Sequence, residues 1–232
     1  MRGKQGAAHF EMIVSFVFFM GFILFLFTVI KPYDTTTLSS SVVSGLYDSF
    51  EGAVSTNLTS VFLKANNTEG GCFRIELFPI MFRYTLNGAN VIVTDISGGA
   101  VLAEMSNSDL KINSDSVFYN VLISPEFEHV TVSDCSGVVD NYELGSLIES
   151  RVISYNALLN MSNRYYSDYD KLRADLDISS VFDFAIVSED FPEIDMTHIV
   201  PSSGDVLAKD FFVEVLNSTG IVSNDRITLK VW

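Results

Sequence analysis

Tryptophan, proline, histidine and basic residues are all scarce in this chain of 232 residues. It has one Trp, five Pro, three His and 14 Lys plus Arg, against 29 Asp plus Glu, for a formal net charge of −15. A chain with this excess of acid repels the phosphates of nucleic acid, which excludes a nucleic-acid-binding role. Apolar residues still make up 48 % of the chain, enough to bury a core.

The motifs of common enzyme classes are missing as well. There is no GxSxG, no HExxH, no glycine-rich phosphate loop and no CxxC. The three histidines, His9, His129 and His198, are far apart in the sequence. We therefore predict no enzyme, no metal site and no cofactor. A site assembled from distant residues, as in an exported hydrolase, is the alternative.

Only two cysteines are present, Cys72 and Cys135, at the ends of one segment with strand-like patterning. An isolated pair in an exported domain is most simply a disulfide, worth about 4 kcal/mol in the chain-entropy model. Two buried free thiols are the alternative. Four N-x-Ser/Thr sequons are candidate glycosylation sites, and they permit glycosylation without establishing it: Asn57, Asn66, Asn160 and Asn217.

One long apolar run stands near the N-terminus. From Met12 to Ile30 the chain has no charged residue and no proline. In a helix the run covers roughly 28 Å, close to the hydrocarbon thickness of a bilayer, so we expect residues 7–31 to form a transmembrane helix. A buried core helix is the alternative. Arg2 and Lys4 predict a single-pass protein of the cytoplasmic membrane with its N-terminus inside and its C-terminal domain at the cell surface.

The residues before this run carry a further pattern. A short basic stretch ends in Gly6, Glu11 lies five positions beyond that glycine, and no small-x-small cleavage site follows Ile30. This arrangement resembles the class III signal of type IV pilins and archaeal pilin-like proteins. The resemblance implies that residues 1–6 are a leader, that a prepilin-type peptidase cuts between Gly6 and Ala7, and that Glu11 mediates packing between subunits. A glutamate that only lies at headgroup level is the alternative for Glu11.

The chain after Pro32 begins with a helical pattern. Apolar residues at spacings of three and four predict an amphipathic stalk helix from Thr35 to Lys64, within a segment of stalk and loop at residues 32–68. Membrane helix, proline bend and stalk helix would then make one long N-terminal rod.

The remainder predicts a head of the α+β class. Short alternating runs predict a β-rich subdomain with an antiparallel sheet over residues 69–137. Residues 138–232 are expected to complete the head with one long helix at about 142–176 and C-terminal strands. Among these strands, the runs around residues 211–216 and around residues 226–231 are expected to pair in antiparallel fashion.

Two clusters are candidate ligand sites. Tyr165, Tyr166 and Tyr169 could stack on a sugar, although aromatic residues at helical spacing are more often part of a core. Five acids are close in sequence: Asp183, Glu189, Asp190, Glu193 and Asp195. They could hold Ca²⁺, but their spacing does not match an EF-hand loop, and a solvated acidic face is the alternative that we favour.

These features predict a membrane-anchored surface protein that acts as a pilin-like subunit, or minor pilin, of a type IV pilus-like filament. Such a subunit would form homo- or hetero-oligomers through its N-terminal helix. The alternative is an anchored surface protein that does not polymerise and binds a partner or glycan through its ectodomain.

Overall fold

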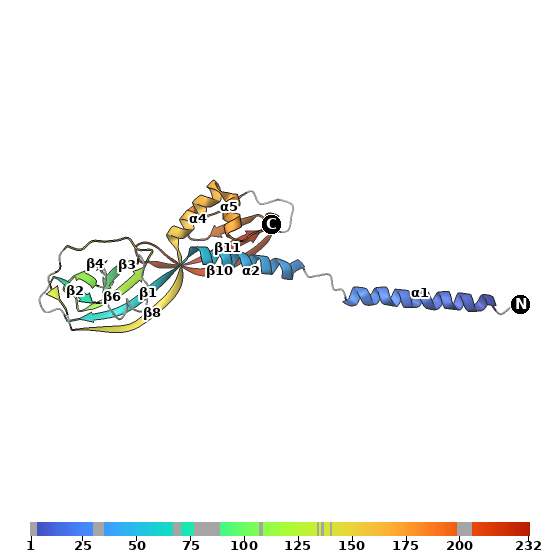
Figure 1. The fold of residues 1–232 in the computed structure, drawn as a ribbon, viewed down its shortest axis with the longest axis horizontal. Coiled ribbons are helices and arrows are strands. Elements are labelled where there is room, and N and C mark those ends of the chain that lie inside the picture. Colours follow the sequence, from blue (N-terminus) through green and yellow to red (C-terminus); the bar gives the residue numbers. More distant parts are fainter. Residues whose placement is uncertain are drawn as a thin grey trace. The chain divides into compact units, whose positions relative to one another are not determined.

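The computed structural model describes residues 4–29, 35–66, 71–76, 89–106, 109–133, 135, 137–139, 141–198 and 206–232. Figure 1 shows the helices and strands along the chain, which divides into two compact units, residues 1–44 and 45–232. The first unit holds helix α1 (Lys4–Val29) and the beginning of helix α2 (Thr35–Val54). The remainder of α2 and all of the described strands belong to the second unit.

The second unit is built on one mixed sheet. Its eleven described strands lie in the order β7-β2-β5-β4-β3-β6-β1-β8-β10-β11-β9. The strands are β1 (Ser55–Ala65), β2 (Cys72–Glu76), β3 (Asn90–Asp95), β4 (Ala100–Ser106), β5 (Asp109–Asn113), β6 (Phe118–Ser124), β7 (Gly137–Val138), β8 (Tyr142–Ser154), β9 (Phe184–Ser188), β10 (Leu207–Leu216) and β11 (Val222–Val231). The other helical elements described are α4 (Tyr155–Ser167), α5 (Tyr169–Asp175) and the 3-10 turn η1 (Pro192–Ile194).

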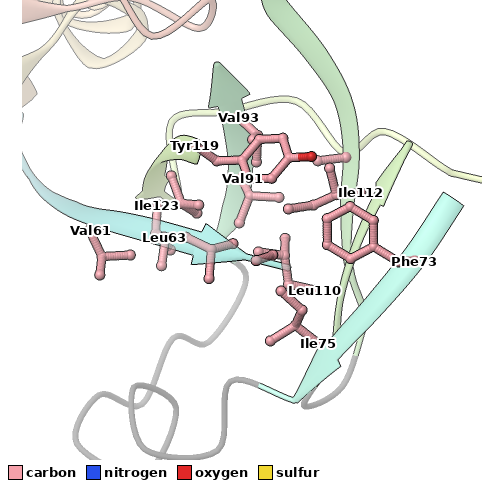
Figure 2. Close-up of a cluster of buried hydrophobic side chains, with 13 residues drawn as sticks. Val61, Leu63, Phe73, Ile75, Val91, Val93, Leu110, Ile112, Tyr119 and Ile123 are labelled. Carbon is pink, nitrogen blue, oxygen red and sulfur yellow. The ribbon is translucent and has the colours of Figure 1, made fainter. Parts of the chain in front are cut away.

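The first part of the sheet curls around a buried apolar core. Side chains from β1 to β6 point to a common centre (Figure 2). Phe73 of β2 and Tyr119 of β6 have three strands between them in the sheet order, yet their ring centroids are only 5.8 Å apart. The sheet must therefore bend until these strands face each other, because side chains on a flat sheet would not meet across three strands.

The second part of the sheet carries the helices. Ser154 ends β8 and caps α4, because its Oγ accepts a hydrogen bond from the Ala157 N–H at 2.9 Å. Tyr165 of α4 is fully buried and donates its hydroxyl proton to the Phe184 carbonyl of β9 at 2.7 Å. Residues 45–54 of α2 also contribute buried apolar side chains, which are Leu46, Phe50 and Val54.

The expected stalk helix ends earlier than the pattern predicted. α2 stops at Val54, and residues 55–65 form strand β1 instead of a continued helix. The alternation of the buried Val61, Leu63 and Ala65 is that of a strand facing a core. Threonine and valine in this stretch favour a strand because branching at Cβ restricts them in a helix.

The expected long helix at residues 142–176 is also wrong. Its first part is strand β8, and only α4 and α5 are helical. The pairing of β8 with β1 shifts between Val61, opposite Leu147, and Leu63, opposite Leu144. One extra residue in β8 therefore bulges out of the ladder, and the spacing of three between Leu144 and Leu147 imitates a helix.

The sheet is mixed where an antiparallel one was expected. β8 pairs with β10, and β2 pairs with β7, in parallel. The predicted C-terminal hairpin is confirmed: β10 pairs with β11 in antiparallel register over their full length, from Leu207 opposite Val231 to Leu216 opposite Val222.

The expected membrane span is overturned. Of the helices in the described part of the chain, none combines the length and the apolar content that crossing a membrane requires. α1 also takes Lys4 and Glu11 into the helix, so its N-terminal turns carry charged residues. The single-pass topology and the membrane localisation predicted from residues 7–31 are wrong with it.

Candidate functional site

Helix α1 exposes apolar side chains around its whole circumference. Exposed fractions run from 47 % for Met20 to 74 % for Met12. The large apolar residues concerned are Met12, Ile13, Phe16, Val17, Phe18, Phe19, Met20, Phe22, Leu24 and Phe25. Five of them are consecutive, and consecutive helical residues point in all directions around the axis. Monomeric proteins rarely expose an apolar surface of this extent, so α1 is a candidate contact surface.

The residues that the pilin resemblance implies in leader cleavage and subunit packing also lie in α1. Gly6 and Ala7 are part of α1, and the Glu11 side chain is exposed. Glu11 is the one charged group among the described side chains of α1, and it stands at the N-terminal border of the apolar surface. A carboxylate in this position needs a cation once apolar neighbours cover it.

A cleft opens in the second unit at the point where β8 and β10 separate. The two strands pair only at two positions, Ile153 with Val215 and Ser154 with Leu216. Beside this short contact lies an open cavity of about 150 Å³. It is lined by Tyr47 and Glu51 of α2, Ser55 of β1, Arg151, Val152 and Ile153 of β8, and Phe212, Val213 and Glu214 of β10.

The balance of charge in this cleft is acidic. Glu51 and Glu214 line it together with a single cation, Arg151, whose Nε donates a hydrogen bond to Ser55 Oγ at 2.8 Å. Burial raises the pKa of Tyr47, and the Glu51 carboxylate raises it further, against a smaller opposing effect of Arg151. The cleft therefore favours a cationic ligand over an anionic one.

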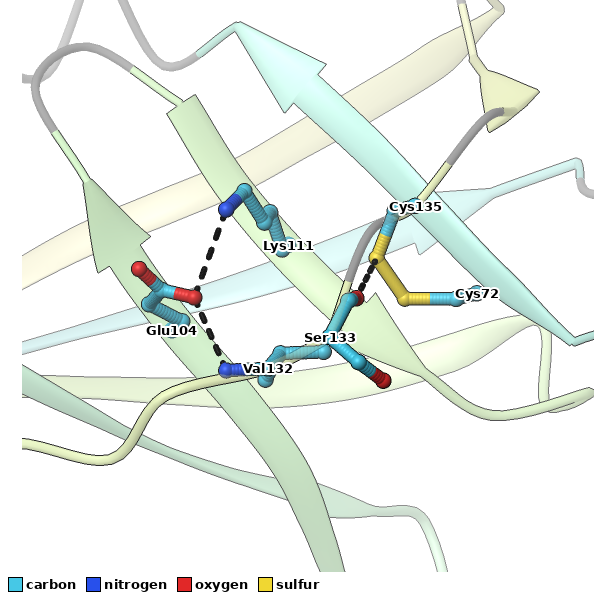
Figure 3. The surroundings of a disulfide bond; sticks show 6 residues. All are labelled: Cys72, Glu104, Lys111, Val132, Ser133 and Cys135. Atoms are coloured by element: carbon cyan, nitrogen blue, oxygen red, sulfur yellow. Dashed lines mark hydrogen bonds and ion pairs between the residues drawn. A yellow bond between two sulfur atoms is a disulfide. The ribbon is translucent and has the colours of Figure 1, made fainter.

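The predicted disulfide is confirmed (Figure 3). Cys72 and Cys135 are bonded, with their Cα atoms 4.9 Å apart. The bond joins the first residue of β2 to the segment that runs from β6 towards β7.

A buried carboxylate, that of Glu104, also holds the segment between β6 and β7, at Val132. Glu104 of β4 accepts a hydrogen bond from the Val132 N–H at 2.8 Å and an ion pair from Lys111 Nζ at 3.3 Å (Figure 3). Chiefly because of the Val132 hydrogen bond, and then because of Lys111, the pKa of Glu104 lies below its ordinary value of 4.5. The Glu104 carboxylate holds Val132 and the disulfide holds Cys135 on the sheet.

The four sequons differ in accessibility. The side chains of Asn57, Asn66 and Asn160 are exposed, so each can be reached from solvent. Asn217 is half-buried, and its Oδ1 accepts hydrogen bonds from the Thr219 and Ile221 N–H groups in the turn between β10 and β11.

The tyrosine cluster is part of the core. Tyr165 is buried, and the Tyr169 hydroxyl accepts a hydrogen bond from the Phe184 N–H at 3.2 Å. Burial raises the pKa of Tyr169 to about 12. His198 stacks on Tyr165 with 4.7 Å between ring centroids, as a structural histidine does. Tyr166 is exposed, but its hydroxyl donates to the Asp195 carbonyl, so no open aromatic platform remains.

The acidic cluster does not converge on one point. Glu189 pairs with Arg226 at 2.8 Å, Glu193 accepts the Tyr155 hydroxyl proton, and Asp183 accepts that of Tyr169. Asp195 accepts the Ser188 N–H. In the described part of the chain no group of three or more His, Cys, Asp or Glu side chains could hold a metal ion.

The cleft between β8 and β10 was missed at the level of sequence. Its charged residues come from three distant elements, and none belongs to a motif. One signal was available: Phe211 and Phe212 are adjacent in a strand, so they must point to opposite faces and one of them faces away from the helices. Phe212 is 83 % exposed.

Comparison of the chain with family models, with curated proteins and with solved structures finds no match.

Proposed function

We propose that this protein is a subunit of a filament-like assembly, in which copies of α1 pack together and each copy contributes its sheet-bearing unit. The observation that carries the proposal is the apolar surface of α1, which is exposed on every side in a single chain. An amphipathic helix can bury one stripe against its own domain. A helix that is apolar all round needs neighbours on several sides, and a bundle of identical helices supplies them.

Glu11 gives the bundle a register. The N-terminal residues resemble those of type IV pilins and their archaeal counterparts, and cleavage after Gly6 would leave a free α-amino group on Ala7. In a bundle, that cation of one copy can pair with Glu11 of the next. A buried carboxylate without such a partner destabilises its surroundings by about 3–5 kcal/mol, so a helix shifted out of register is disfavoured.

Two substitutions test processing and assembly separately in cells that contain a prepilin-type peptidase. Gly6→Phe should leave the leader attached, seen as a higher intact mass. Glu11→Ala should allow cleavage but reduce the fraction of protein in sedimenting assemblies, and Glu11→Gln tests whether the charge itself matters. A wild-type chain that keeps residues 1–6 in such cells contradicts the proposed processing. A Glu11→Ala chain that assembles as well as wild type contradicts the packing role.

A further inference from the structure

Among the strands that the structure describes, β8 has a partner along one edge, and its other edge is open over most of its length. Along residues 142–153 it pairs with β1, and β10 reaches it only at residues 153 and 154. Among the described strands, no other pairs with β8. In an antiparallel ladder every second residue turns its N–H and C=O groups to the side away from its partner. Every second residue along 143–151 of β8 therefore turns its N–H and C=O groups to an edge on which the described strands supply no partner, and most residues of this stretch are exposed.

The open edge leads into the cleft described above. Val152, Ile153 and Val213 are among the residues that line this cleft, and its volume is about 150 Å³. This is enough for one side chain of an incoming strand and too little for a folded element. Binding sites that recognise a peptide by β-strand addition combine two features, an open strand edge and a pocket for a side chain.

Charge selects the kind of strand that fits. Glu51 and Glu214 line the cleft with Arg151 as the cation among the described lining residues. Glu149 adds a further carboxylate on β8, whereas Glu143 of β8 is already paired with Lys64 at 3.0 Å. A second copy of β8 would bring its own glutamates against these, and like charges on paired strands repel. A segment with lysine or arginine at alternate positions meets them with opposite charge. The strongly negative net charge of the whole chain acts in the same direction.

We propose that the β8–β10 cleft binds an extended basic segment of a partner protein, which adds to the open edge of β8 as a further strand and places one side chain in the cavity. This binding site does not depend on the assembly of α1. It acts through the second unit alone, with backbone hydrogen bonds supplying affinity and the cleft carboxylates supplying selectivity.

The test uses the full chain and an acetylated, amidated peptide of alternating lysine and valine, labelled for fluorescence anisotropy. When the peptide is added, hydrogen exchange should slow at alternate residues along β8 143–151, because the amides that face the open edge gain acceptors. Replacing Glu51 and Glu214 by glutamine should weaken binding about 3- to 10-fold. Glu128→Gln, which removes a charge from the segment after β6, is the matched control and should leave affinity unchanged.

Two further peptides make the test decisive. One carries proline at alternate positions, which removes the backbone donors, and the other carries glutamate in place of lysine. Both should bind at least about tenfold more weakly than the basic peptide. Equal binding of the proline peptide would show charge attraction without strand addition, and equal binding of the acidic peptide would remove the argument from charge. Protection elsewhere in the chain, or none in β8, would overturn the proposed site.

Discussion

The ring of Tyr47 stacks on the ring of Phe211, with 3.8 Å between centroids and 7° between planes. Tyr47 belongs to α2 and Phe211 to β10, so one aromatic pair joins the helix to the C-terminal hairpin. Lys209 lies over the same Phe211 ring, 4.9 Å from its centroid. Because Tyr47 also lines the cleft, the position of α2 on the sheet decides how wide the cleft is.

Phe211→Ala should lower the free energy of unfolding by about 2–4 kcal/mol, since it removes the stacked ring and leaves a gap under α2. Tyr47→Phe is the matched control, because it keeps the ring and should change stability by less than about 0.5 kcal/mol. Urea unfolding followed by circular dichroism measures both. Equal stability of Phe211→Ala and wild type would show that α2 is held by other contacts.

Removal of the disulfide should weaken the second unit. The bond closes a loop with a sequence separation of 63, for which the chain-entropy model gives about 4 kcal/mol. The double substitution Cys72→Ser with Cys135→Ser should therefore lower the urea midpoint clearly, and wild type with added reductant should approach the same value. An unchanged midpoint in both would mean that Glu104 and the core hold Val132 and Cys135 in place without the bond.

Acid should weaken the attachment of Val132 to Glu104 and so lower the stability of the fold. The pKa of Glu104 is lowered in the folded chain, so its contribution is complete above its ordinary pKa of 4.5 and is lost as the pH falls through the folded value. At pH 7, Glu104→Gln should be less stable than wild type by about 1 kcal/mol, and the difference should shrink below pH 4.5. Glu128→Gln, at an exposed carboxyl, serves as the control. A difference that stays constant from pH 7 to pH 3 contradicts the assigned role of the carboxylate.

Gly220 is required by the turn between β10 and β11. Its φ of +84° is unfavourable for other residues, and a Cβ there would meet Ile92 Cδ1 at 3.0 Å. Gly98 also has a positive φ, of +81°, but open space around it. Gly220→Ala should therefore cost more stability than Gly98→Ala, about 2–3 against about 1 kcal/mol in thermal unfolding. Equal losses would show that Ile92 moves aside freely.

The sequence predicted those parts of the fold that depend on local pattern. The C-terminal hairpin followed from two apolar runs around a glycine-containing turn, and the disulfide from the position of Cys72 and Cys135 at the ends of one strand-rich segment. The hairpin signal is local in the sequence, and the disulfide involves the one pair that two cysteines allow. The early end of α2 was missed, because helical spacing of apolar residues continued past Val54 into β1.

Features that depend on long-range pairing were not predictable. The bulge in β8 gives its apolar residues a spacing of three, which is typical of a helix. The bulge can be recognised only from the pairing of β8 with β1, and this pairing depends on the tertiary structure. The cleft needs α2, β8 and β10 to be in place before Glu51, Arg151 and Glu214 meet. No spacing in the sequence brings these three together.

The most direct test of the account is the sedimentation of the chain that begins at Ala7, at micromolar concentration in aqueous buffer. Wild type should sediment as large assemblies, far above the 25.7 kDa of the 232-residue chain. Glutamine at Val17, Met20 and Leu24, on one face of α1, should shift most of the protein to a single-chain species, while Phe212→Gln in the second unit should leave the assemblies unchanged. Wild type that sediments as a single chain, or assemblies that survive the three α1 substitutions, would contradict assembly through α1.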